Sequence, residues 1–201
     1  MKRKLTGMSE QKMFNRLNSW FVSATEQEVA EGKVWYSDSQ EFAEDVSGRY
    51  RLNPFTVACV ISALSPNNKW RRNMIDTIAV VETWIQGGKP EDVSVCTYGA
   101  NKAKAFELLA TNGRLDKVSI KTWNFAHNVG LLSSKHVTVD KWMVRAALTF
   151  ANEGKKDTVE NCTAKQYEQI ADCIRKIAER TDLKAYQVQA IIWVAIRNNW
   201  E

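Results

Sequence analysis

Residues 52–68, "LNPFTVACVISALSPNN", indicate the fold class more clearly than any other part of the chain. Asn53 can cap a helix, and Pro54 fits the first helical turn, where its missing N–H leaves no hydrogen bond unmade. The residues from Phe55 to Leu64 would be apolar on almost every side of that helix. Because a helix without a polar face has to be surrounded, we expect this segment at the centre of a helical core.

Helical spacing of apolar residues continues along most of the chain, and no convincing pairs of alternating strands appear. The sequence therefore predicts an all-α protein of about nine or ten helices. Plausible caps include Ser9, Asn53, Asp140 and Thr163. The expected helices cover residues 9–30, 38–50, 54–64, 70–86, 90–95, 99–112, 117–129, 140–150, 163–180 and 183–199.

The composition is that of a globular protein rather than a disordered one, with 44% hydrophobic and 25% charged residues among 201. A chain of this length can bury a core without disulfides or metals. The net charge of +5 is compatible with a polyanionic partner but does not require one. No apolar run reaches the roughly 20 residues that span a bilayer, and no apolar segment follows the basic start "MKRKLTGMSEQK". We therefore expect a soluble intracellular protein without a membrane partner.

Cysteine and histidine are too few and too scattered to suggest a metal centre. The four cysteines form no C-x-x-C pair, so neither a zinc ribbon nor an iron–sulfur cluster is indicated. Free thiols in a reducing cytosol are the ordinary interpretation. The two histidines, His127 and His136, cannot supply a multi-histidine site. We expect no cofactor and no metal.

Two polar residues open helices that are otherwise largely apolar. Asp140 lies in "HVTVDKWMVR" (136–145), and Lys121 opens "KTWNFAHNVG" (121–130). Taken singly, an aspartate at this position is an ordinary N-cap and a lysine on a helix is ordinarily solvated. The N-terminal ends of two consecutive helices need not meet, so the sequence alone does not establish a contact between them.

The order of the segments within residues 53–145 resembles the helix-hairpin-helix superfamily of DNA glycosylases, and most of all its endonuclease III branch. "NPFTVACVISALS" (53–65) is similar to the opening core helix of that family, and "YGANKAKAFELL" (98–109) to its Lys-Ala helix. "KTWNF" (121–125) resembles the segment that carries the catalytic lysine, and "VTVDKWMVR" (137–145) the one that carries the catalytic aspartate. "YQVQAIIWVAIRNNW" (186–200) resembles the closing helix.

The resemblance implies one two-lobed domain. Lobe one would comprise residues 1–52 and about 150–201, and lobe two residues 53–150 with a hairpin-like segment at 112–129. It also implies an enzyme that flips a base out of double-stranded DNA and cleaves its N-glycosidic bond. Asp140 would stabilise the positive charge that develops at C1′, and Lys121 would attack C1′ to form an imine, giving lyase activity. We expect the protein to act as a monomer.

The same resemblance suggests the residues that contact DNA. Most lie in the loop after the first core helix and at the start of the next helix, where a basic cluster either binds phosphates or is simply solvated. Trp70 either stacks on a base or belongs to the core. The expected DNA contacts are Leu64, Asn67, Asn68, Lys69, Trp70, Arg71, Arg72, Lys117, Ser119 and Arg145. The candidates for stacking on the flipped base are Trp35, Tyr36, Trp123 and Trp142.

The chain departs from the family pattern in three respects. Its hairpin reads "LDKVSIK" (115–121) and lacks the family's glycines, Lys141-Trp142 replaces a Thr-His pair, and the iron–sulfur cysteines of many relatives are absent. A divergent, phage-encoded member, placed in the cytoplasm of its host, is compatible with these features. Two alternatives stay open: a viral enzyme of DNA base hypermodification on the same scaffold, and a non-catalytic DNA-binding module in which Asp140 is only a cap.

Overall fold

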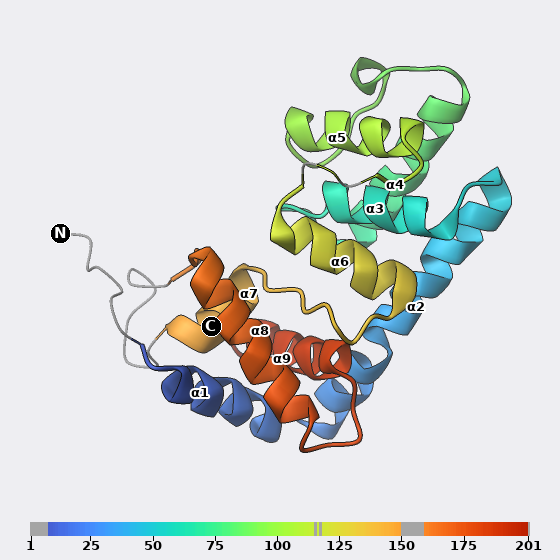
Figure 1. Cartoon of the computed structure of the whole chain (residues 1–201). Coiled ribbons are helices and arrows are strands. Elements are labelled where there is room, and N and C mark those ends of the chain that lie inside the picture. The colour runs from blue at the N-terminus through green and yellow to red at the C-terminus, as the bar shows by residue number, and fades with distance from the viewer. Residues whose placement is uncertain (1–7, 115, 117, 150–158, 201) are drawn as a thin grey trace. The chain divides into compact units, whose positions relative to one another are not determined.

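The computed structural model describes residues 8–114, 116, 118–149 and 159–200. Within these residues the chain forms nine α-helices, one short 3-10 helix and no strand (Figure 1). The prediction of an all-α fold is therefore confirmed. The chain divides into two compact units: unit 1 comprises Met1–Tyr36 and Ser134–Glu201, and unit 2 comprises Ser37–Ser133. None of the described helices is long and apolar enough to cross a membrane.

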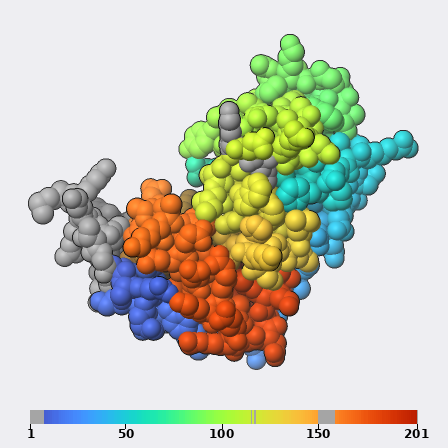
Figure 2. Space-filling model, viewed as in Figure 1, coloured from blue at the N-terminus to red at the C-terminus, as the bar shows by residue number. Residues whose placement is uncertain are grey.

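Unit 1 is a bundle in which α1 packs against α7, α8 and α9. Figure 2 shows the α1 residues in dark blue directly beside the orange and red residues of α8 and α9. Its core is aliphatic and includes the fully buried Leu17, Met143 and Ile174. Its helices are α1 (Glu10–Ser23), the first part of α2 (Glu26–Tyr50), α7 (Lys141–Leu148), α8 (Ala164–Ala178) and α9 (Ala185–Asn199).

Unit 2 is built around α3, which packs against α4, α5 and α6. Every residue of α3 from Thr56 to Leu64 is buried, as the all-round apolar pattern predicted. Gly130 permits the close approach of α6, because a Cβ there would lie 2.8 Å from Phe55 Cδ2. The elements that follow α2 are α3 (Pro54–Leu64), α4 (Trp70–Ile85), the 3-10 helix η1 (Pro90–Asp92), α5 (Gly99–Ala110) and α6 (Ile120–Leu131).

The first two helices do not lie where the sequence predicted them. The helix expected over 9–30 ends at Ser23, and the next one begins at Glu26 rather than at 38. The chain is extended at Ala24, and a reciprocal capping box restarts the helix directly afterwards. In that box Thr25 N donates to Glu28 Oε2 (2.9 Å), and Glu28 N donates to Thr25 Oγ1 (3.3 Å). The Thr-x-x-Glu pattern is present in the sequence and marks the true helix start.

The boundaries between the two units also differ from the predicted ones. Unit 2 begins at Ser37, within the continuous helix α2, rather than at residue 53. It ends at Ser133 rather than near 150, because Val137, Val139 and Met143 belong to the core of unit 1. Asp140 and Arg145 therefore lie in unit 1, and not in the unit that contains Lys121.

Glu28 connects the start of α2 with the end of α9. Its Oε1 accepts hydrogen bonds from Asn198 Nδ2 (3.3 Å) and Asn199 Nδ2 (2.9 Å), while Oε2 accepts from the Thr25 amide. The hydrogen bond from that amide is the largest of the contributions that lower the pKa of the Glu28 carboxyl. The ionised carboxylate is therefore the form that stabilises this corner of unit 1.

We predict that Glu28→Gln lowers the free energy of unfolding by about 1–2 kcal/mol at pH 7. Because the pKa of Glu28 is lowered in the folded state, its contribution is present above the ordinary carboxyl pKa. It is lost as the pH falls through the lowered value, so the two proteins should converge in acid. Denaturant unfolding at several pH values measures this, with Glu26→Gln in the same helical turn as control. An equal difference at neutral and acidic pH would contradict the assignment.

Candidate functional site

The loop between α3 and α4, Ser65–Lys69, is braced by side chains of the segment before α5. Asn67 has a φ of +56°, in the left-handed region that asparagine tolerates better than most residues. Its Nδ2 donates to the hydroxyl of Tyr98 (2.9 Å), and Thr97 Oγ1 donates to the carbonyl of Pro66 (3.1 Å). The loop therefore holds a defined conformation at the surface of unit 2.

Asp76 on α4 connects this loop with its surroundings. Its carboxylate is fully buried and accepts at Oδ1 from Arg72 Nε (2.7 Å). Oδ2 accepts from Asn68 Nδ2 (2.9 Å) and from the backbone N–H of Cys96 (2.8 Å). Three donors compensate the loss of hydration of a buried carboxylate. Asp76 is not among the predicted site residues, although its four-residue spacing from Arg72 on a helix is a signal present in the sequence.

Lys121 contacts the same loop from α6. Ser119 caps α6 by accepting from Thr122 N (3.2 Å), which fixes Lys121 in the first helical turn. Lys121 Nζ donates to Ser65 Oγ (3.3 Å), and Ser65 Oγ donates to the carbonyl of Ser62 (2.9 Å). Ser62 Oγ in turn donates to the carbonyl of Thr122 (2.8 Å). Unit 2 thus brings the candidate nucleophile to the beginning of the candidate DNA-contact loop.

Asp140 in unit 1 caps α7, as the sequence predicted. Its Oδ1 accepts from the backbone N–H groups of Trp142 (2.9 Å) and Met143 (3.0 Å). Its Oδ2 accepts from Trp193 Nε1 on α9 (2.9 Å). A carboxylate offers about four acceptor positions, and these donors of unit 1 use three of them.

Buried tyrosines hold the segment that leads to Asp140. The hydroxyl of Tyr167 accepts from Val139 N (3.1 Å) and donates to the carbonyl of Val137 (2.9 Å). Tyr36 donates its hydroxyl to Gln189 Oε1 (2.7 Å), and burial raises the pKa of Tyr36 so that it stays protonated. Asp140 is therefore presented from a fixed backbone rather than from a mobile loop.

Three of the predicted contact residues are buried or paired with protein groups. Leu64 is fully buried and Tyr36 is 2% exposed, so neither offers a surface to DNA or to a base. Arg145 forms an ion pair with Glu160, and its guanidinium lies 4.3 Å from the centre of the Trp142 ring. This is a structural contact in unit 1 rather than a side chain extended towards phosphate.

The remaining candidate aromatic residues also contact protein groups. The Trp35 ring lies 5.5 Å from that of Trp193 in unit 1, and the Trp70 ring lies 6.3 Å from that of Phe42 in unit 2. Trp70 and Phe42 are both half-buried, so the role of Trp70 stays a prediction. Trp123 is half-exposed, and its ring lies 4.4 Å from that of His127 on the next turn of α6.

Trp123 and Lys121 do not belong to one surface of α6. Two residues along an α-helix correspond to a rotation of about 200°. The two side chains therefore leave α6 on nearly opposite sides.

The exposed cations of the predicted interface are found at the start of α4. Lys69, Arg71 and Arg72 are all exposed, and Lys69 at the N-cap position makes no side-chain cap hydrogen bond. Ser119, which was predicted to contact phosphate, is exposed and caps α6. Lys117 lies outside the described residues. The predicted DNA-contact residues that stay on the surface thus cluster around the Ser65–Lys69 loop.

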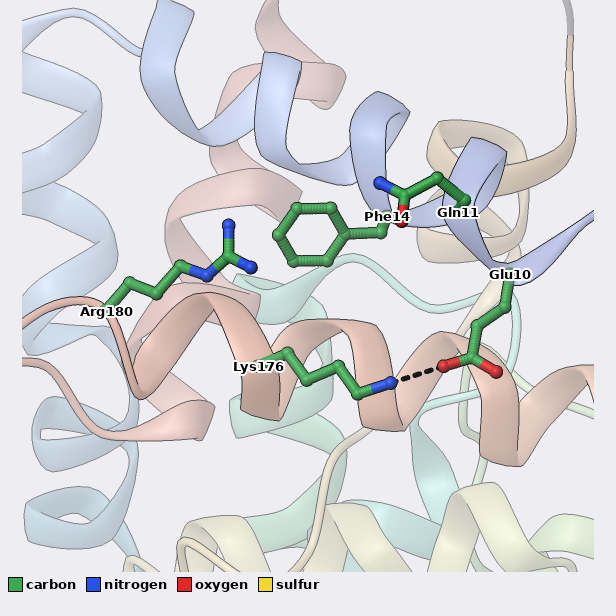
Figure 3. Close-up of a pocket in the computed structure, with 5 residues that line it drawn as sticks. All are labelled: Glu10, Gln11, Phe14, Lys176 and Arg180. Atoms are coloured by element: carbon green, nitrogen blue, oxygen red, sulfur yellow. Dashed lines mark hydrogen bonds and ion pairs between the residues drawn. The ribbon is translucent and has the colours of Figure 1, made fainter.

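A surface hollow of unit 1 contains none of the predicted site residues. Figure 3 shows Lys176 reaching Glu10, with which it forms an ion pair, and Arg180 pointing to the ring of Phe14. The Arg180 guanidinium lies 4.6 Å from the centre of that ring. Gln11 completes the lining. Both cations are thus engaged with protein groups.

Comparison with known proteins shows a family but gives no activity. Residues 1–200 match a family of unknown function, DUF7178, and the chain belongs to it. No curated protein and no solved structure matches the chain. Any function therefore has to be inferred from the residues and their geometry.

Asp140 caps α7 and accepts a hydrogen bond from Trp193. The free energies of unfolding of variants separate these two structural roles. Asp140→Ala removes both the cap and the acceptor for Trp193, and we expect it to lower the free energy of unfolding by about 2 kcal/mol. Asp140→Asn keeps a good capping residue and should cost about half as much, roughly 1 kcal/mol. The double variant of Asp140→Asn and Trp193→Phe should lose less than the sum of the two single losses, because both substitutions remove the same hydrogen bond. Denaturant unfolding gives these values; fully additive losses would refute the Trp193 contact.

Proposed function

We propose that this chain is a DNA-acting enzyme that flips a base and cleaves its N-glycosidic bond, with Lys121 and Asp140 as its catalytic groups. The observation that carries the proposal is the contact of Lys121 Nζ with Ser65 Oγ (3.3 Å). It places a primary amine beside a rigid loop whose neighbouring exposed residues are cationic. The resemblance of residues 53–145 to helix-hairpin-helix DNA glycosylases supports the same assignment.

Asp140 would act on the charge of the transition state. As the base departs, positive charge develops at C1′ of the sugar, and a carboxylate fixed nearby stabilises it. The hydrogen bonds from Trp142 N, Met143 N and Trp193 Nε1 hold the Asp140 carboxylate in one orientation. One acceptor position is left to face the sugar. Preorganisation of this kind costs nothing at the moment of reaction.

Lys121 would act as the nucleophile. Its neutral Nζ attacks C1′, and the electron pair of the C1′–N bond leaves with the base, which takes up a proton. The C1′–O4′ bond then breaks, its electron pair stays on O4′, and O4′ takes up a proton. The lone pair of Nζ forms the C1′=N bond of the imine as Nζ loses its remaining proton. Only a primary amine can form this bond, so Arg in the same position would keep the charge but not the chemistry.

Phosphate binding would come from the start of α4. Lys69, Arg71 and Arg72 are exposed there, next to the loop that Lys121 contacts. Arg and Lys that neutralise phosphates release counterions, which supplies most of the sequence-independent affinity for DNA. The net charge of +5 acts in the same direction.

One observation favours a second candidate, a non-catalytic DNA-binding module. Three of the acceptor positions of Asp140 are already used by donors of its own unit, as expected of a purely structural cap. In that case DNA binding would persist in Asp140→Asn and Lys121→Ala, and no DNA product would form.

Borohydride trapping tests the role of Lys121. We expect the wild type to form a covalent adduct with a duplex that contains an abasic site, and Lys121→Ala and Lys121→Arg to form none. Lys165→Ala is the matched control, because Lys165 is also the second residue of a helix that follows a hydroxyl cap. It should trap like the wild type. Unchanged trapping by Lys121→Arg would contradict the assignment of Lys121 as the nucleophile.

Mass spectrometry of nucleosides separates the alternatives. A released base together with abasic DNA indicates excision. An altered base with an intact glycosidic bond, formed on modified DNA, would indicate base hypermodification instead. DNA binding without any product would indicate the non-catalytic DNA-binding module.

A further inference from the structure

Within the part of the chain that the structure describes, the guanidinium of Arg72 is held along its Nε edge. Its Nε donates to Asp76 Oδ1 at 2.7 Å, from a side chain that is 48% exposed, whereas that of Asp76 is fully buried. A guanidinium is a planar fork with five N–H donors in fixed directions. Fixing the Nε edge therefore fixes the directions of the terminal amino groups.

The same carboxylate also fixes the loop that precedes α4. Asp76 Oδ2 accepts from Asn68 Nδ2 (2.9 Å) and from the Cys96 N–H (2.8 Å). Asn68 Nδ2 in addition lies 3.3 Å from the carbonyl of Leu64, at the end of α3. One buried acid thus joins a surface cation, the Ser65–Lys69 loop and the segment before α5.

We propose that Asp76 is a positioning residue for phosphate binding. It holds Arg72 by the Nε edge so that the exposed amino groups bind a DNA phosphate, and it fixes the adjoining loop. This inference rests on the proposed DNA-binding function. Arginine suits the role because its amino groups bind phosphate oxygens in a forked geometry. Orientation by a buried partner reduces the rotamer freedom that would otherwise be lost on binding.

Net charge alone predicts that neutralising Asp76 strengthens DNA binding, whereas the positioning role predicts that it weakens binding. The sign of the change in affinity therefore tests the inference. Asp76→Asn raises the net charge of the protein by one, and a more positive protein binds a polyanion more tightly when nothing else changes. If Asp76 positions Arg72, the same substitution weakens binding. A charge-matched control lies on α2, where Asp45 and Arg49 form an exposed pair with the same four-residue spacing (2.7 Å).

The measurement is the affinity of the full chain for a fluorescein-labelled plain DNA duplex, followed by anisotropy over a series of salt concentrations. Asp76→Asn should weaken binding about tenfold, although its net charge is higher. Asp45→Asn should bind as tightly as the wild type or slightly more tightly. The slope of log K against log salt should fall by about one in both Asp76→Asn and Arg72→Ala. Combining these two substitutions should add little, because both remove one contact.

A second pair of variants tests the inference without changing Asp76. Arg72→Lys retains the charge, but a single ammonium cannot serve Asp76 and a phosphate in the same forked geometry. We expect Arg72→Lys to weaken binding as Arg72→Ala does, whereas Arg49→Lys, in the exposed pair with Asp45 on α2, leaves it unchanged. Thermal unfolding by circular dichroism establishes that each variant is folded. Should Asp76→Asn not fold, the comparison of Arg72→Lys with Arg49→Lys decides.

Two outcomes overturn the inference, and they are distinguishable. If the wild type binds duplex DNA but a folded Asp76→Asn binds as tightly as Asp45→Asn, or Arg72→Lys binds like the wild type, Asp76 has no positioning role. If the wild type does not bind duplex DNA even at low salt, the proposed function itself fails, and the inference fails with it.

Discussion

The burial of α3 on all sides is the constraint on which unit 2 depends. Because every residue from Thr56 to Leu64 is buried, α4, α5 and α6 have to surround this helix. At its C-terminal end the chain has to emerge at the surface, and there it forms the Ser65–Lys69 loop. The packing of one apolar helix thus determines where a polar loop appears.

Polar bonds at the end of α3 then set the register of its neighbours. Ser62 Oγ donates to the carbonyl of Thr122 on α6, and Asn73 Nδ2 on α4 donates to the carbonyl of Ile61 (3.0 Å). Buried hydrogen bonds of this kind are costly to leave unmade, so they select one arrangement of the helices. Lys121 reaches Ser65 as a consequence of this register. The position of Lys121 beside Ser65 therefore follows from the packing of the core helices.

Local signals in the sequence predicted the elements that they govern. Asn53-Pro54, Asp140 and Thr163 each mark a helix start, and the structure has caps at these positions. α2 begins at Glu26 rather than at residue 38, because the capping box of Thr25 and Glu28 starts a new helix directly after the extended Ala24. A capping box and a helical apolar repeat are both local signals. At Thr25 the capping box determines where the helix starts.

Tertiary features could not be predicted in the same way. Nothing in the pattern of residues 137–144 says which core they join, and in the structure they pack into the core of unit 1. The contacts of Asp76 with Asn68 and Cys96 depend on how two loops meet, which no local rule describes. The opposite directions of Lys121 and Trp123, in contrast, follow from helix geometry and could have been worked out from their spacing.

The proposed function requires that Lys121 and Asp140 act on one nucleotide. The most direct test is a crystal structure of the full chain bound to a DNA duplex that carries a stable abasic-site analogue. The account predicts that Lys121 Nζ and a carboxylate oxygen of Asp140 both lie within about 6 Å of the C1′ position of the analogue. A complex in which the sugar is contacted by only one of these side chains, or by neither, would contradict it.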